Sequence, residues 1–163
     1  MSAAPPLQTL SQILFSQGFG TRRRCAALIA DGQVQVGGAT LDDPLASLPI
    51  EGLEFTVQGQ TWPYRAKALV MLHKPAGYEC SAKPRHHPSI LGLLPAPLRE
   101  RGVQPVGRLD EDTTGLLLLT DDGNLTLIGA LAAEATARAV VSAIYHATGL
   151  PGLPAARDLG GAL

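Results

Sequence analysis

Acidic side chains are crowded into one short segment of the sequence, GRLDEDTTGLLLLTDDG, at residues 107–123. Carboxylates at this density point to one of two kinds of chemistry: several of them bind a cation together, or one of them reacts. A calcium loop of the EF-hand type would use Asp110, Asp112, Thr114, Gly115 and Asp121. A catalytic loop would instead present Asp110 to an electrophilic carbon.

The residues that flank the acidic segment favour the catalytic interpretation. An EF-hand loop needs a helix before it, and Pro105 and Gly107 both oppose one. After the loop, residues 116–119 form a continuous apolar run that predicts a buried strand entering an Asp-Asp-Gly turn. The last ligand position, Asp121, is also shorter than the bidentate Glu that calcium loops use. We therefore expect no calcium here.

Arg108 stands two residues before Asp110, and its guanidinium would pair with the carboxylate and hold it ionised and oriented. Gly107 would let the backbone approach a ligand closely. By the residues alone, a structural ion pair explains this Arg-x-Asp turn as well as catalysis does.

The formal net charge of -1 hides a segregation of charge along the chain. Residues 60–108 contain eight Lys or Arg and two acids, whereas residues 109–125 contain five acids and no base. Lys74, Lys83 and Arg85 of the basic segment are candidate phosphate contacts, with a solvated surface as the alternative. A basic segment beside an acidic loop suits a polyanion-binding surface around a carboxylate site.

A second basic group, Arg22, Arg23 and Arg24, falls in the first turn of a predicted helix that Thr21 would cap. The helix dipole disfavours cations at this end, by about 0.3 to 1 kcal/mol each. Bound phosphate would supply the missing negative charge, so RNA contact is the interpretation we favour over a solvated basic face.

The elements that would position these residues predict an α+β chain of two domains. The N-terminal domain is expected at residues 7–61. It would contain helices over 7–17 and 22–30 and a hairpin that turns at Gly37-Gly38. A further strand near 53–57 would either add to the sheet of this domain or form its edge. Residues 58–68 hold the linker, which we place at 62–68. The second domain is expected at residues 69–163. It would contain a strand over 69–72, a helix near 96–101, the strand at 116–119 and an Ala-rich helix over 131–145. In the last helix, Glu134 and Arg138 would form an ion pair.

The stretch from Leu10 to Leu48, containing TRRR and DGQVQVGG, resembles the small RNA-binding module named after ribosomal protein S-four. The resemblance implies that the turn at Arg22 to Arg24 and the following helix contact RNA. It indicates the class of ligand and not the reaction.

KPAGYECS at 74–81, followed by PVGRLDEDTTGLLLLTDDG at 105–123, resembles the pseudouridine synthases that modify ribosomal RNA and carry an S-four-like module before a mainly antiparallel catalytic domain. The resemblance implies that Asp110 is the nucleophile, that Arg108 is its arginine neighbour and that Lys74 and Pro75 line the cleft. It implies no metal and no organic cofactor. The expected substrate is a uridine of ribosomal RNA, of the small subunit, free or in a pre-ribosomal particle; whether the carboxylate attacks the sugar or the ring stays open.

The resemblance covers about residues 7–125, and an incomplete catalytic domain with a divergent tail from about 126 is expected beyond it. Tyr145 is the candidate for the family's uracil-contacting tyrosine. A truncated or frame-shifted gene would explain the change of composition. The rival hypothesis is accordingly a non-catalytic RNA-binding protein, or an inactive fragment of such an enzyme.

The remaining features of the sequence are ordinary for a soluble protein. Apolar residues make up 45% and charged residues 17%, and no apolar run approaches the roughly 20 residues that span a bilayer. Cys25 and Cys80 are expected as reduced thiols, and the spacing of Cys80 and the neighbouring histidines matches no zinc site. We expect a cytoplasmic monomer that contacts no membrane.

Overall fold

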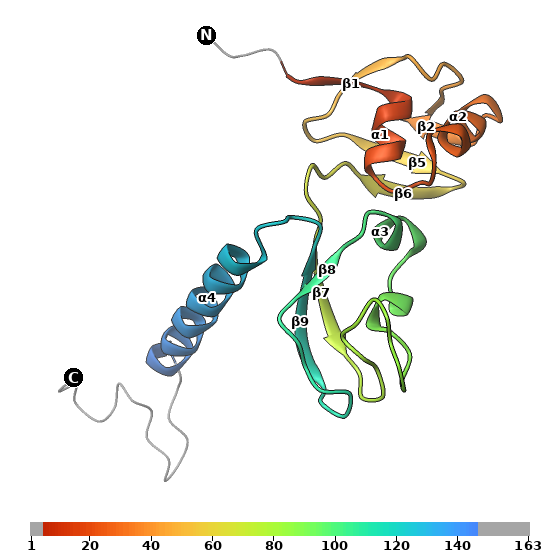
Figure 1. Ribbon diagram of the computed structural model, residues 1–163. Helices are drawn as coiled ribbons and strands as arrows, with labels where there is room; N and C mark the ends of the chain where they lie inside the picture. Colours follow the sequence, from red (N-terminus) through yellow and green to blue (C-terminus); the bar gives the residue numbers. More distant parts are fainter. Residues whose placement is uncertain (1–4, 147–163) are drawn as a thin grey trace. The chain divides into compact units, whose positions relative to one another are not determined.

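The computed structural model describes residues 5–146, and the chain divides into two compact units, the first ending at Asp122 and the second beginning at Gly123 (Figure 1). The elements of the first unit are β1 (Leu7–Thr9), α1 (Leu10–Ser16), α2 (Arg22–Ala30), β2 (Val34–Val36), β3 (Ala39–Thr40), β4 (Ser47–Pro49), β5 (Glu54–Val57), β6 (Gln60–Pro63), β7 (Leu69–Lys74), a 3-10 helix (Ile90–Leu93), α3 (Ala96–Glu100), β8 (Gln104–Val106) and β9 (Gly115–Thr120). The second unit contains α4 (Leu125–His146).

The N-terminal part of the first unit packs α1 and α2 on a four-stranded antiparallel sheet in the order β3-β2-β5-β6. The predicted start of α2 is confirmed, because the Thr21 hydroxyl accepts the N–H of Arg24 at 3.3 Å. The predicted hairpin is confirmed as well. Gly37 and Gly38 have φ angles of 58° and 81°, which a two-residue hairpin turn of this kind requires.

The predicted helix over 7–17 was wrong in its first turn. Leu7 to Thr9 form β1, which pairs antiparallel with β4, and Leu7 is exposed. The helix starts only at Leu10, since Thr9 caps it and exchanges hydrogen bonds with Gln12 in a capping box. The partner of β1 lies some forty residues away in the sequence, so no local periodicity could announce it.

The expected linker, placed at 62–68, begins two residues too early. Gln60 to Pro63 form β6, which pairs with β5, and β5 is therefore an interior strand and not an edge. Tyr64 still belongs to this part, because its N–H donates to the carbonyl of Leu53 at 2.8 Å and its ring joins the N-terminal core.

A second antiparallel sheet has the order β7-β9-β8 and its own apolar core. The strand expected at 116–119 is confirmed as part of β9, but only one of its faces is buried. Leu117 and Leu119 pack in the core, whereas Leu116 is 64% exposed, because side chains alternate along a strand. Leu69 and Met71 of the paired strand β7 are also exposed.

In the second unit, α4 begins earlier than the helix expected over 131–145. The predicted pair is confirmed: Arg138 forms an ion pair with Glu134 one turn away. Tyr145 lies in this helix, but its side chain is outside the described part of the chain, as are residues 147–163. Within residues 5–146, no helix is both long enough and apolar enough to cross a membrane.

Candidate active site

The Asp110 loop, residues 107–114, joins β8 to β9. The element before it is thus a strand, as is the element after it, where an EF-hand has helices. Asp110, Glu111 and Asp112 all expose their side chains to solvent. The carboxylate of Asp121, the last position of the calcium pattern, lies beyond β9 and accepts hydrogen bonds from Arg101 and from the N–H of Ala68. Among the described residues, no cluster of acidic, His or Cys side chains could hold a metal ion.

Lys74 supports the Asp110 loop from inside. Its side chain is fully buried, and its ammonium donates to the carbonyl oxygens of Asp110 and Thr113, both at 2.8 Å, and of Glu111 at 3.1 Å. A fourth carbonyl, that of Pro75, lies at 3.2 Å. Three carbonyls of one loop therefore turn inward to one cation, which fixes the backbone at Asp110.

This placement corrects the expectation that Lys74 contacts phosphate. A fully buried ammonium that already donates to four carbonyl oxygens has no hydrogen left for RNA. The sequence suggested an accessible lysine because it stands at the end of a strand in a basic segment. It lies instead at the last residue of β7, opposite Gly115, where the loop folds over it.

The segment after Lys74 makes two further contacts with the Asp110 loop. The N–H of Gly77 donates to the carbonyl of Glu111 at 2.7 Å. The N–H of Leu109 points at the Cys80 sulfur at 3.5 Å. The two segments that carry the sequence motifs are thus joined on both sides of Asp110, once between backbone groups and once through the Cys80 side chain.

Glu79 organises the loop that carries Arg85 and two histidines. Its carboxylate accepts the backbone N–H groups of His86 and His87 at 2.7 and 2.8 Å, and that of Arg85 at 3.0 Å. These hydrogen bonds, with those from His86 and His87 contributing most, lower the pKa of Glu79 to about 2. Residues 85–87 are therefore held in place by an ionised carboxylate.

The two loops enclose an open pocket of about 630 Å³. It is lined by Glu79, Cys80, Ser81, Arg85, His86, His87, Arg108, Leu109, Asp110 and Glu111. The volume falls in the range of about 300–1,000 Å³ that is usual for small-molecule sites. Of the residues that the sequence proposed, the structure brings Asp110, Arg108 and Arg85 together here, while Lys83 is exposed and lies outside the lining.

The expected ion pair between Arg108 and Asp110 is not formed. In the described part of the chain, ion pairs join Arg101 to Asp121 and Arg138 to Glu134. Arg108 and Asp110 are both exposed, and between solvated groups an ion pair gains too little free energy to fix two side chains. Lys74, and not Arg108, contacts the loop, and it holds the backbone rather than the Asp110 carboxylate.

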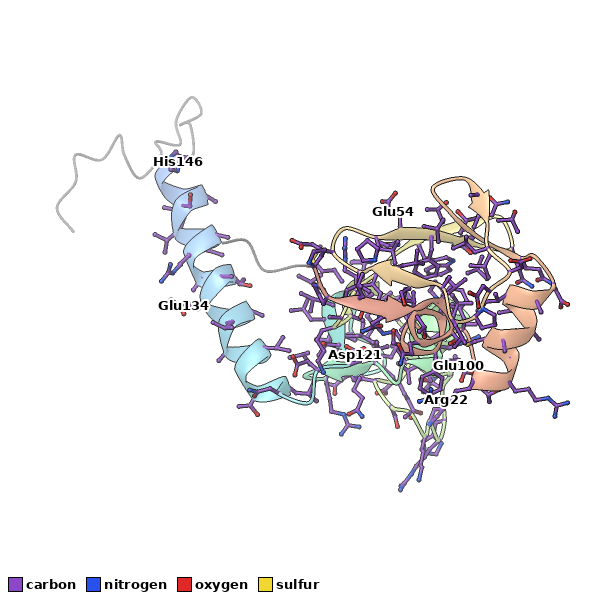
Figure 2. The ribbon with its side chains drawn as sticks, turned by 90° about the horizontal axis from the view of Figure 1, so that it is seen from above. Arg22, Glu54, Glu100, Asp121, Glu134 and His146 are labelled. Atoms are coloured by element: carbon purple, nitrogen blue, oxygen red, sulfur yellow. The ribbon has the colours of Figure 1, made fainter. Side chains whose placement is uncertain are left out.

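Arg22, Arg23 and Arg24 form the exposed first turn of α2, where the structure has no acidic residue (Arg22 is labelled in Figure 2). The Arg22 guanidinium lies over the Phe15 ring, 4.6 Å from its centre. Arg24 lines a different pocket from that of Asp110. These arginines form a basic surface that is separate from the Asp110 pocket, and their contact with RNA stays a prediction.

Sequence reasoning missed two groups that shape this part of the chain. Nothing in the sequence marked Glu79 as an acceptor for three backbone N–H groups six to eight residues ahead. Nor was Arg101 singled out, although it is one of the two cations in the described residues that form an ion pair with a carboxylate. The only available signal was its position in a predicted helix followed by Gly102.

The chain is similar in sequence to a group of known proteins. The family described as RNA pseudouridylate synthase matches residues 68–149. An uncharacterised RNA pseudouridine synthase of Bacillus subtilis is 32% identical over 116 residues, covering 71% of this chain and 48% of that protein. A ribosomal large subunit pseudouridine synthase B of Xanthomonas axonopodis is 34% identical and covers 75% of this chain and 23% of its own length. A ribosomal small subunit pseudouridine synthase A of Vibrio parahaemolyticus is 36% identical, with coverages of 63% and 43%.

The family match runs to residue 149, so the resemblance does not stop near residue 125 but extends through α4. The chain spans about half or less of the length of these relatives. The match takes in both halves of the pocket, the Glu79 loop and the Asp110 loop. With half of its length matched, this chain belongs to the RNA pseudouridylate synthase family.

Proposed function

We propose that this protein isomerises a uridine of ribosomal RNA to pseudouridine with Asp110 as the nucleophile. One observation carries the proposal: the buried ammonium of Lys74 holds the backbone of the Asp110 loop, while the Asp110 carboxylate stays exposed at a pocket that also contains Arg85 and Arg108. A reactive carboxylate needs this combination of a fixed position and free access.

The chemistry follows from the difference between the two nucleosides. The target uridine leaves the RNA stack and enters the pocket, at a cost of a few kcal/mol that contacts with the protein offset. The Asp110 carboxylate adds to the nucleoside, the bond between N1 of uracil and C1′ of the sugar breaks, and a bond between C5 and C1′ forms. The hydrogen on C5 leaves as a proton, N1 gains a proton, and the carboxylate is released unchanged.

The cationic side chains would bind the RNA backbone in two places. Arg85 and Arg108 line the pocket and would contact the phosphates that flank the flipped uridine. Arg22, Arg23 and Arg24 would hold a second stretch of RNA at the first turn of α2. Lys83, exposed beside the pocket loop, would add charge without a fixed partner.

The ribosomal subunit whose RNA is the substrate and the choice between catalysis and RNA binding alone both need a direct test. The relatives include proteins named for the large and for the small ribosomal subunit, so both RNAs are candidates, and the small-subunit RNA is the one we propose. The alternative function is RNA binding without catalysis. It is favoured by the exposed arginines at the first turn of α2, which do not line the Asp110 pocket.

Mapping pseudouridine separates these possibilities. Unmodified transcripts of both ribosomal RNAs are incubated with the purified chain, with Asp110→Asn and with Asp112→Asn, whose carboxylate is equally exposed in the same loop. We expect one modified uridine with the parent chain and with Asp112→Asn, and none with Asp110→Asn. RNA binding by all three proteins without any modification would support the binding function and reject the enzymatic one.

A further inference from the structure

The seam between the N-terminal part of the first unit and the β7-β9-β8 sheet is held by polar contacts. The apolar core of the N-terminal part ends at Tyr64, and that of the sheet part begins at Ala68. Among the described residues, no buried cluster includes residues of both parts. Two pockets open along the seam, of about 250 Å³ and about 630 Å³, so apolar side chains do not fill it. Another interaction must therefore set the relation between the two parts.

Arg101, the residue that follows α3, supplies that interaction. Its side chain is only 5% exposed, and its Nε and Nη2 donate to the same carboxylate oxygen of Asp121 at 2.8 and 2.6 Å. Its Nη1 donates to the side-chain oxygen of Gln17 at 2.8 Å. One rigid guanidinium thus joins the end of β9 to the end of α1 (Asp121 is labelled in Figure 2).

The partners of Arg101 also fix the connection between the two parts. Gln17 is buried, and its amide exchanges two hydrogen bonds of 3.1 Å with the backbone of Arg65. The other oxygen of Asp121 accepts the N–H of Ala68 at 2.7 Å. The connection between the two parts is therefore fixed at Arg65 by Gln17 and at Ala68 by Asp121. The Arg101 guanidinium binds both Gln17 and Asp121.

Close backbone packing at the same place is a second, independent observation. Gly18 follows Gln17 with a φ of +84°, and a Cβ added to it would lie 2.0 Å from the carbonyl oxygen of Pro97 in α3. The turn after α1 therefore approaches α3 as closely as a glycine allows. Arg101 is anchored where the two parts touch.

We propose that Arg101 is a positioning residue that holds the RNA-binding arginines of α2 at a fixed place relative to the Asp110 pocket. The inference rests on the proposed function, because it assumes that one RNA contacts both surfaces. With the two surfaces fixed, the second contact of a long RNA is intramolecular and benefits from a high effective concentration. Only uridines at a suitable distance from the RNA bound at α2 would then reach Asp110.

The test compares three variants of the full chain. Arg101→Gln removes the guanidinium, and Gln17→Ala breaks the link to α1 while leaving the buried ion pair with Asp121 intact. Arg99→Gln is the matched control, since it removes an exposed arginine from α3, two residues before Arg101. Circular dichroism verifies that each variant is folded, and Gln17→Ala keeps the test valid if Arg101→Gln is not.

The first measurement does not depend on catalysis. Spin labels are attached to cysteines introduced at Gln35 in β2 and Gln104 in β8, which are both exposed, and they report the distance between the two parts. The native cysteines Cys25 and Cys80 are buried. We expect one narrow distance distribution for the parent and for Arg99→Gln, and a broad one for Arg101→Gln and Gln17→Ala. Distributions of equal width in all four proteins would overturn the proposal.

The second measurement separates positioning from a merely structural role. We expect the two seam variants to bind a long ribosomal RNA fragment at least tenfold more weakly, with an equal rise in KM, while their affinity and kcat for a short hairpin containing the target stay within twofold of the parent. Equal losses on both RNAs would overturn the positioning role. If the parent forms no pseudouridine, the proposed function fails, whereas the distances and the affinities still decide this inference.

Discussion

Replacing Lys74 by Met should release the Asp110 loop while leaving its sequence intact. Methionine has a similar length and fills the same fully buried space, but it donates no hydrogen bond. The carbonyl oxygens of Asp110, Glu111 and Thr113 would lose their common donor. These carbonyls would then turn to water, and the loop backbone would turn with them.

The size of the effect follows from the contacts. A hydrogen bond to a charged group contributes about 1.5–3 kcal/mol. Two of the bonds of Lys74 measure 2.8 Å, and because the loop is exposed, water recovers part of their loss. We therefore expect the loop to lose about 3 kcal/mol, roughly a hundredfold in its opening equilibrium. Misplacing Asp110 by about 1 Å would lower the rate by about a hundredfold as well.

Hydrogen exchange measures this opening locally. The N–H of Thr113 donates to the carbonyl of Asp110 and the N–H of Gly77 to that of Glu111, so both amides report on the loop. Their protection should fall about a hundredfold in Lys74→Met and stay within about 0.5 kcal/mol of the parent in the control Lys83→Met. Unchanged protection of both amides in Lys74→Met would refute the role assigned to Lys74.

Three further predictions test other parts of the structure. Changing Arg22 and Arg23 together to Glu should weaken RNA binding. It should also reduce the magnitude of the slope of log K against log salt concentration by about 1.4–1.8, the value for two phosphate contacts. Because the pKa of Glu79 is lowered from 4.5 to about 2, its support of residues 85–87 is complete above pH 4.5 and is lost as the pH falls through about 2, which amide exchange in this loop would follow. Gly18→Ala should cost about 2 kcal/mol or more in urea unfolding, from its positive φ and the overlap with a carbonyl of α3.

Each of these three predictions has a control and a contradicting result. For the arginines, the control is a double variant in which Lys67 and Arg99 are changed to Glu, because it alters the net charge by the same amount at another place. If both double variants lost the same RNA affinity, a specific RNA-binding surface at α2 would be contradicted. For Glu79, loop protection that changes only above pH 6 would contradict the assigned cause. For Gly18, the control is Gly37→Ala, which has a positive φ and open space around it; equal losses at both positions would mean that close packing at the seam is unimportant.

The sequence predicted the elements whose signals are local. The cap at Thr21, the hairpin turn at Gly37-Gly38 and the strand after Gly115 all follow from neighbouring residues. The candidate nucleophile could be proposed from its motif, and the structure exposes it at a pocket that also contains Arg85 and Arg108. The assignment itself stays a prediction until Asp110 is replaced.

Features that depend on distant residues could not be predicted. The sequence placed Lys74 on the RNA surface, because the carbonyls that bury it come from residues 36 to 39 positions away. Arg101 went unnoticed because Gln17 lies 84 positions from it. The pair of Arg108 and Asp110 was expected from their proximity in sequence, but solvent exposure removes the energetic reason for such a pair.

Release of the C5 hydrogen is the most direct measure of the central claim that Asp110 performs the isomerisation. Ribosomal RNA transcripts that carry tritium at C5 of uridine should lose one tritium to water for each pseudouridine formed. We expect release by the parent chain and by Asp112→Asn, and no release by Asp110→Asn although it still binds the RNA. Release by Asp110→Asn at the rate of the parent would contradict the claim.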